Sequence, residues 1–171
     1  MGTSTYTNTT TRTFTHTATH LAGVIASALA ETLVAIGISV DKISRVYGYE
    51  SAISAWIEQR SLASVRITIT PPGGAESAAY SFEIDYTTWN PDEELREQLA
   101  RLRRQLAKEP RVPIGTEFNV TVIPRPGFHL SDQSGWSDRT TALPSFNDGY
   151  RHGTAGTGPG AAAVFRSHRI G

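Results

Sequence analysis

Residues 17–37 read TATHLAGVIASALAETLVAIG, and their apolar positions recur with the period of an α-helix. Thr15 or Thr17 is available as the N-cap, and Gly37 is placed to end the helix. The recurring apolar residues are Leu21, Val24, Ile25, Ala28, Leu29, Leu33 and Ile36. Because they cover most of the circumference, we predict a central helix that is buried on most sides.

Threonine occupies every odd position from Thr3 to Thr19, just before and into this helix. Alternating β-branched residues favour an extended backbone, so the pattern predicts a strand from Tyr6 to Thr15. Only Tyr6 and Phe14 bring apolar bulk to the other face of that strand. We therefore expect a weak edge strand or an accessible tail.

The composition excludes several classes of protein. The chain has 171 residues, no cysteine, and 16 basic and 16 acidic side chains that cancel. Such a length can bury a core without metals or disulfides, and a neutral balance disfavours direct binding to nucleic acid or membranes. No uninterrupted apolar run reaches the roughly 18 residues that a membrane helix requires, and no export signal is apparent. We expect a cytoplasmic protein without a membrane segment.

Between residues 51 and 123 the pattern predicts an α+β arrangement. Ser51 is an N-cap candidate for a short helix whose buried face carries Ile53, Trp56 and Ile57. Two alternating segments, 65–69 and 80–86, flank the turn at 71–74 and predict an antiparallel hairpin. A long helix is expected to follow Asn90 as its N-cap, with a stripe of Leu95, Leu99, Leu102 and Leu106. Phe118, Val120 and Val122 alternate in a further strand.

From Pro124 onward the apolar period is lost, and glycine and proline are frequent. We predict an irregular segment with one short strand over 162–167. The glycine-rich run from Gly153 to Gly160 lacks the Lys-Ser/Thr pair of a phosphate-binding loop, so a hinge is the better interpretation.

The search for chemistry is mostly negative. His16 and His20 have the spacing of a metal pair on a helix, but no third ligand is apparent, so we interpret them as capping or packing residues. Ser131 and His129, with Asp132 or Asp138, would compose a triad on paper, and a small hydrolase is kept as an alternative. Nothing in the sequence suggests oxyanion donors or a strained nucleophile turn.

Three stretches carry a resemblance to a known family. TFTHTATHLA at 13–22 runs into the long helix, Tyr47-Gly48-Tyr49 follows it, and SAWIEQRSL at 54–62 leads into a strand. These stretches and the order of the elements resemble the bacterial HORMA-domain proteins of antiphage cyclic-oligonucleotide signalling systems (CBASS).

The resemblance implies one HORMA domain over residues 1–171, with an N-terminal segment 1–16, a core 17–123 and a mobile "safety belt" 124–171. It implies a non-catalytic adaptor with no cofactor and no metal. Its partners would be a short closure peptide that adds a strand to the sheet, a cGAS/DncV-like nucleotidyltransferase that the closed form activates, and an AAA+ ATPase that resets the switch. A second HORMA protein is a further partner to consider. The alternative within the family is a constitutive scaffold or a self-assembling subunit.

This resemblance assigns roles to three groups of residues. The strand that receives the peptide would present Phe118, Val120 and Val122. The belt would be anchored by large side chains among the glycines, namely Trp136, Phe146, Tyr150, Val164 and Phe165. The ATPase would engage the N-terminal threonines Thr3, Thr5, Thr7, Thr9 and Thr11.

Overall fold

The computed structural model describes residues 2–74, 78–133, 136 and 149–169, and within them six strands form one antiparallel sheet in the order β3-β5-β6-β2-β1-β4. The helical elements are α1 (Gly2–Ile36), α2 (Val40–Ile43), the 3-10 helix η1 (Ser44–Tyr49), α3 (Glu50–Glu58) and α4 (Leu99–Leu106). The strands are β1 (Leu62–Thr70), β2 (Ala78–Tyr86), β3 (Arg96–Glu97), β4 (Glu117–Pro124), β5 (Tyr150–Gly158) and β6 (Ala161–Arg169). The α+β class predicted from the sequence is confirmed.

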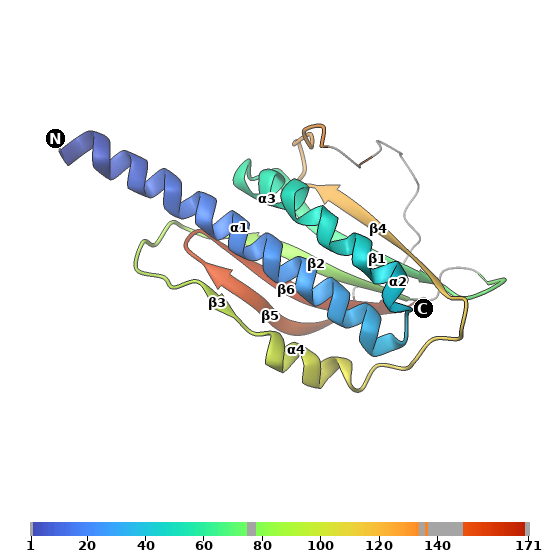
Figure 1. Cartoon of the computed structure of the whole chain (residues 1–171). Helices are drawn as coiled ribbons and strands as arrows, with labels where there is room; N and C mark the ends of the chain where they lie inside the picture. Colours follow the sequence, from blue (N-terminus) through green and yellow to red (C-terminus); the bar gives the residue numbers. More distant parts are fainter. Residues whose placement is uncertain (1, 75–77, 134–135, 137–148, 170–171) are drawn as a thin grey trace.

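Helix α1 crosses one face of the sheet, with α3 beside it and α4 near β5 (Figure 1). Every apolar residue of its predicted repeat is buried. The helix ends at Gly37 as predicted: the backbone N–H of Ile38 donates to the Leu33 carbonyl at 2.9 Å, and that of Gly37 donates to Val34 at 3.0 Å. This double closure, with a positive φ at Gly37, is a Schellman motif.

The predicted hairpin is confirmed by the pairing of β1 with β2, from Ser64↔Glu83 to Ile69↔Ala78. The apolar residues of the two strands that face α1 and α3 are Val65, Ile67, Ile69, Tyr80, Phe82 and Ile84, and all are buried. The short helix α3 also buries its predicted face. It begins at Glu50 with Tyr49 in the N-cap position, so the predicted N-cap at Ser51 is wrong.

The strand predicted from Tyr6 to Thr15 is wrong, because α1 begins at Gly2 and continues through that segment. A strand needs a neighbour to bond its backbone, whereas a helix bonds its own. The first turns of α1 project beyond the sheet in Figure 1, where no strand lies beside them. The predicted N-caps are also wrong, since Thr17 is fully buried within the helix and Thr15 Oγ1 donates to Glu58 Oε1 at 3.0 Å.

The helix predicted after Asn90 is shorter than its leucine stripe indicates. The Asn90 side chain does accept a backbone N–H two residues on, at 3.1 Å, but the turn does not propagate. Arg96 and Glu97 instead form β3 on the edge of β5, and α4 begins only at Leu99. The backbone of this segment bonds to a strand that is distant in the sequence, which the local pattern cannot reveal.

The C-terminal region is more regular than predicted. Strands β5 and β6 form a hairpin, and β6 pairs with β2 along its whole length. The glycine-rich run lies in β5 and the following turn, so the hinge interpretation is wrong. A Cβ atom at Gly156 would lie 3.1 Å from Val24 Cγ1, and one at Gly158 would lie 2.9 Å from Thr17 Cγ2. These glycines allow β5 to pack closely against α1.

One segment of α1, Phe14–Ile36, is long and apolar enough to cross a membrane by length and composition alone. This differs from the expectation drawn from its interrupted apolar run. In the structure, 61% of the most apolar window is buried against the rest of the chain, as is typical of a core helix.

Candidate functional site

Strand β4 forms one edge of the sheet. It pairs antiparallel with β1, from Ser64↔Ile123 to Thr70↔Glu117, and no strand among the described residues pairs with its outer side. The β5–β6 hairpin lies toward the opposite edge of the sheet, where β6 pairs with β2 (Figure 1). An unpaired edge presents backbone donors and acceptors in a row, which is a template for another extended chain.

Two contacts show which backbone groups of β4 point outward. The Asn119 carbonyl oxygen lies 3.5 Å from Thr68 Oγ1 on β1, so it faces inward. The Phe118 carbonyl oxygen accepts a 3.3 Å hydrogen bond from the Arg45 guanidinium on η1, so it faces away from β1. Because backbone groups alternate along an antiparallel strand, the outward-facing groups belong to Phe118, Val120 and Val122.

The same three residues place their side chains on the helix-covered face of the sheet. Phe118 is 5% exposed, whereas Val120 and Val122 are only half-buried against the core. Their cross-strand partners Ile67 and Val65 on β1 are fully buried. The apolar surface of the sheet is therefore incompletely covered along β4.

The chain leaves β4 by turning over the end of β1. The backbone N–H of Arg125 donates to the Ser61 carbonyl at 2.8 Å, and the Arg125 guanidinium lies 4.7 Å from the centre of the Tyr86 ring. The Tyr86 hydroxyl donates to the Leu62 carbonyl at 2.9 Å. Burial raises the pKa of Tyr86 to about 12, although the nearby positive charge of Arg125 opposes the shift. These contacts fix where the segment after β4 begins.

An aromatic cluster then holds this segment against α3. The Trp56 indole N–H donates to the Ser131 carbonyl at 2.8 Å. The Trp136 ring lies 4.9 Å from that of Tyr49 and 5.2 Å from that of Trp56, centre to centre. Of the predicted belt anchors, Trp136 is thus the one placed against the η1–α3 region.

The other predicted anchors lie in different surroundings. Phe165 is buried on β6 and stacks on Tyr80, with 6.1 Å between ring centres. Val164 is also buried, but it points to the opposite face of the sheet from Phe165. Tyr150 is 67% exposed, and Phe146 lies outside the described residues.

Two salt bridges lie near β4 and α4, and only Glu31 of the second pair is clearly part-buried. Lys42 Nζ lies 2.6 Å from Glu117 Oε1, and this hydrogen bond lowers the pKa of the Glu117 carboxyl. Arg103 on α4 lies 2.6 Å from Glu31 Oε1 on α1, and the bonded carboxylate raises the pKa of the arginine. The second pair fastens α4 to α1, and the first fastens α2 to the start of β4.

The structure does not bring together the residues of the alternative hydrolase triad. Ser131 Oγ donates to Gln59 Oε1 at 3.0 Å and accepts from Gln133 Nε2 at 3.2 Å, and no bond joins it to the exposed His129. Asp132 is exposed, and Asp138 lies outside the described residues. The triad interpretation gains no geometric support.

The two histidines of α1 lie in different surroundings. His20 Nε2 lies 2.9 Å from the Arg96 carbonyl oxygen, and His16 is exposed. In the described part of the chain no three His, Asp or Glu side chains gather as metal ligands. His20 instead connects α1 to β3.

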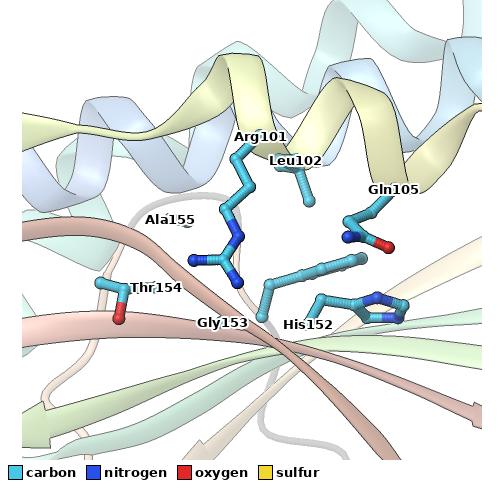
Figure 2. Close-up of a pocket in the computed structure, with 8 residues that line it drawn as sticks. Arg101, Leu102, Gln105, His152, Gly153, Thr154 and Ala155 are labelled. Carbon is cyan, nitrogen blue, oxygen red and sulfur yellow. The ribbon is translucent and has the colours of Figure 1, made fainter.

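Between α4 and β5 there is a small cavity, shown in Figure 2. Arg101 and Gln105 of α4 point from one side toward Gly153 and His152 of β5. Its volume is about 10 Å³, which is room for about one water molecule. It is too small to hold a substrate.

The sequence model of a family described as bacterial HORMA domain 2 matches residues 6–163. The chain belongs to this bacterial HORMA-domain family. The edge strand β4, the β5–β6 hairpin that pairs with β2, and the central helix α1 are therefore parts of a HORMA fold. No match was found among curated proteins.

Solved structures with the HORMA fold are similar over most of the chain. The E. coli MS115-1 CdnC:HORMA-deltaN complex matches with a TM-score of 0.59 and 15% identity, covering 92% of this chain and 89% of that one. A chain of the mitotic checkpoint complex matches with a TM-score of 0.65 and 12% identity, covering 89% and 97%. C. elegans HTP-1 bound to the HIM-3 closure motif matches with a TM-score of 0.54 and 14% identity, covering 75% and 70%. At these identities the likeness establishes the fold alone.

Sequence reasoning missed Arg45 and the role of Trp56 in this HORMA domain. Arg45 lies in a stretch without periodicity, and nothing in the local pattern connects it with Phe118, which is 73 residues away. Trp56 carries the signal of a core residue, and its ring is indeed 2% exposed. The N–H of a buried tryptophan normally donates a hydrogen bond, so an acceptor could be expected beside Trp56. The sequence does not show that this acceptor is the carbonyl of a residue far along the chain.

Proposed function

We propose that this HORMA domain is a non-catalytic adaptor that binds a short extended peptide as an added strand on the outer edge of β4. The main observation behind this proposal is that the outward backbone groups of Phe118, Val120 and Val122 lie beside an incompletely covered apolar surface. In strand addition the backbone hydrogen bonds supply affinity, and alternate side chains supply specificity. The HTP-1 structure with a bound closure motif supports the proposal, since that protein has the same fold.

The segment 124–171 is proposed as the safety belt that closes over the peptide. It leaves the sheet at the edge strand β4 and re-enters it at β5. In the sheet, β5 is separated from β4 by β1, β2 and β6, so this segment connects strands near opposite edges. Trp136 on the Tyr49–Trp56 pair would hold its first part. The buried Phe165 would hold its last part. Detachment of this last part would also require the β6–β2 pairing, which runs along the whole of β6, to be broken.

The proposed output is activation of a cGAS/DncV-like nucleotidyltransferase in bacterial antiviral defence. The E. coli complex of CdnC with a HORMA protein of the same fold supports this partner. An AAA+ ATPase would reset the switch from the N-terminal turns of α1, which project beyond the sheet and carry the threonines from Thr3 to Thr11 (Figure 1). A second HORMA protein remains a candidate partner, and the cytoplasm is the proposed compartment.

The test of peptide binding uses the full chain and random 12-residue peptides displayed on phage. Enriched peptides are synthesised, and their affinity for the wild type is compared with that for Val120→Pro and Val120→Thr. Proline removes an outward N–H that β1 does not use, whereas threonine keeps the N–H and the branched shape. We expect proline to weaken binding at least about tenfold, and threonine to change it much less.

Two outcomes would contradict the proposal. One is that no peptide is enriched over an uncoated control. The other is that Val120→Pro binds an enriched peptide as tightly as the wild type while remaining folded.

A separate measurement distinguishes a sensor from a constitutive scaffold. The activity of the co-purified nucleotidyltransferase is measured with and without peptide, and a scaffold would activate the enzyme equally in both samples.

A further inference from the structure

Arg45 lies at the end of β4 where an added strand would begin or finish. Its guanidinium donates to the outward Phe118 carbonyl at 3.3 Å, and its Cζ lies 4.4 Å from the centre of the Phe118 ring. The side chain is exposed. A peptide strand that pairs with Phe118 takes over this carbonyl with its own N–H. The guanidinium then loses its hydrogen bond but keeps its position over the ring.

The charges around Arg45 leave its guanidinium without a carboxylate. Lys42 and Glu117 pair with each other at 2.6 Å, and the positive charge of Arg45 contributes only a minor part of the lowered pKa of Glu117. No carboxylate of the described residues lies within salt-bridge distance of Arg45. The exposed guanidinium is therefore available to pair with a carboxylate of the ligand.

Strand geometry specifies which peptide side chain meets Arg45. Residues directly opposite each other on paired strands point to the same face of the sheet. The peptide residue opposite Phe118 thus points to the helix-covered face, where Arg45 lies. The peptide residues opposite Val120 and Val122 point to the same face, over the half-buried apolar surface.

We propose that the bound peptide carries an aspartate or glutamate opposite Phe118 and apolar residues at the next two alternate positions, so that Arg45 selects the ligand by charge. This inference rests on the proposed strand addition and deepens it. An arginine–carboxylate pair gives direction as well as charge, so it also fixes the register of the peptide on β4. An error of one residue would turn the apolar side chains to the wrong face.

The test repeats the phage selection with three proteins: the wild type, Arg45→Glu and Arg104→Glu. Arg104 is an exposed arginine on α4, so its reversal is a matched change of net charge away from β4. We expect the wild type and Arg104→Glu to enrich Asp or Glu at one fixed position, two residues from the first of two alternating apolar positions. We expect Arg45→Glu to enrich Lys or Arg at that position.

A second measurement keeps the inference testable if Arg45→Glu does not fold. In an enriched peptide the acidic residue is replaced by its amide, and the affinity for the wild type is measured. We expect a loss of about two- to fivefold, the upper part of the range for an exposed ion pair, and a smaller loss in 0.5 M salt. Val120→Pro must weaken the same peptide, which verifies that it binds on β4.

The outcomes separate the inference from the proposed function. Enriched peptides that require the Val120 N–H but show no acidic preference would overturn the role of Arg45 and leave strand addition intact. Selection of the same acidic peptides by Arg45→Glu would also overturn it. Failure to enrich any peptide would overturn the strand addition itself, and the role of Arg45 with it.

Discussion

The indole N–H of Trp56 donates a 2.8 Å hydrogen bond to the carbonyl oxygen of Ser131. It joins the core helix α3 to the segment that follows the edge strand, across 75 residues of sequence. The donor belongs to a buried ring and the acceptor to a partly exposed loop. This one bond therefore links the packing of the core to the position of the proposed belt.

Replacing Trp56 with phenylalanine should loosen the segment after β4 more than it destabilises the domain. Phenylalanine keeps most of the ring contacts but cannot donate, which removes a bond worth about 1 kcal/mol. We expect faster chymotryptic cleavage after Phe128, an exposed residue of this segment, and a smaller change in the rate of cleavage elsewhere. Gln59→Ala, which removes only the exposed bond to Ser131 Oγ, is the control and should cleave like the wild type. Equal rates for all three proteins would contradict the prediction.

Substituting alanine for Gly158 should lower the stability of the domain. The new Cβ would lie 2.7 Å from Leu95 Cδ2 and 2.9 Å from the buried Thr17 Cγ2, so β5 must move away from α1. Overpacking of this kind costs about 1–3 kcal/mol in the free energy of unfolding, measured by urea denaturation. Gly74→Ala in the β1–β2 turn is the matched control, because its nearest contact would be an ordinary 3.7 Å. An equal effect at both sites would disprove the packing argument.

Tyr86 should make stability fall at alkaline pH. Its pKa is raised from 10.0 to about 12 in the folded chain, so folding favours the protonated phenol. The contribution is fully present below pH 10 and is lost as the pH rises toward 12, because the unfolded state releases the proton first. The free energy of unfolding should fall more steeply between pH 10 and 11.5 for the wild type than for Tyr86→Phe. Parallel curves would show that Tyr86 does not titrate with folding.

Deleting residues 2–12 should leave thermal unfolding almost unchanged. The first turns of α1 project beyond the sheet (Figure 1), whereas Phe14 is buried. Phe14 packs against Trp89 with 6.5 Å between ring centres and lies under the Arg60 guanidinium. Deleting residues 2–16 removes these contacts and the Thr15–Glu58 bond, so it should lower the melting temperature by several degrees. The shorter deletion should also retain peptide binding while abolishing ATPase-driven opening. If the ATPase still opens the variant that lacks residues 2–12, it must engage another part of the chain.

The fold is predictable from the sequence where burial follows a local period. Leu21 to Ile36 repeats at helical spacing, and the segments around Ile67 and Phe82 alternate, so the central helix and the hairpin follow from the pattern alone. The strand of Phe118, Val120 and Val122 is predictable for the same reason. Because these residues bury their side chains against a common core, the sequence must carry the period of the element that they form.

The errors fall where backbone hydrogen bonds depend on distant partners. The threonine repeat matches a strand but lies where no strand is available, so α1 continues through it. Arg96 and Glu97 leave the helical pattern because β5 offers them bonds. The glycines of β5 suggest a loop until α1 is seen packed against them.

The sequence by itself determined that this chain builds a helix-covered antiparallel sheet, because hydrophobic burial imposes a short period on the residues that share a face. Only the tertiary structure decided that β4 is an edge, that its outward groups belong to Phe118, Val120 and Val122, and that Arg45 lies beside them. Strand order and the contacts of an aperiodic loop arise from chain segments that meet only after folding. Residues more than 70 positions apart leave no shared period in the sequence.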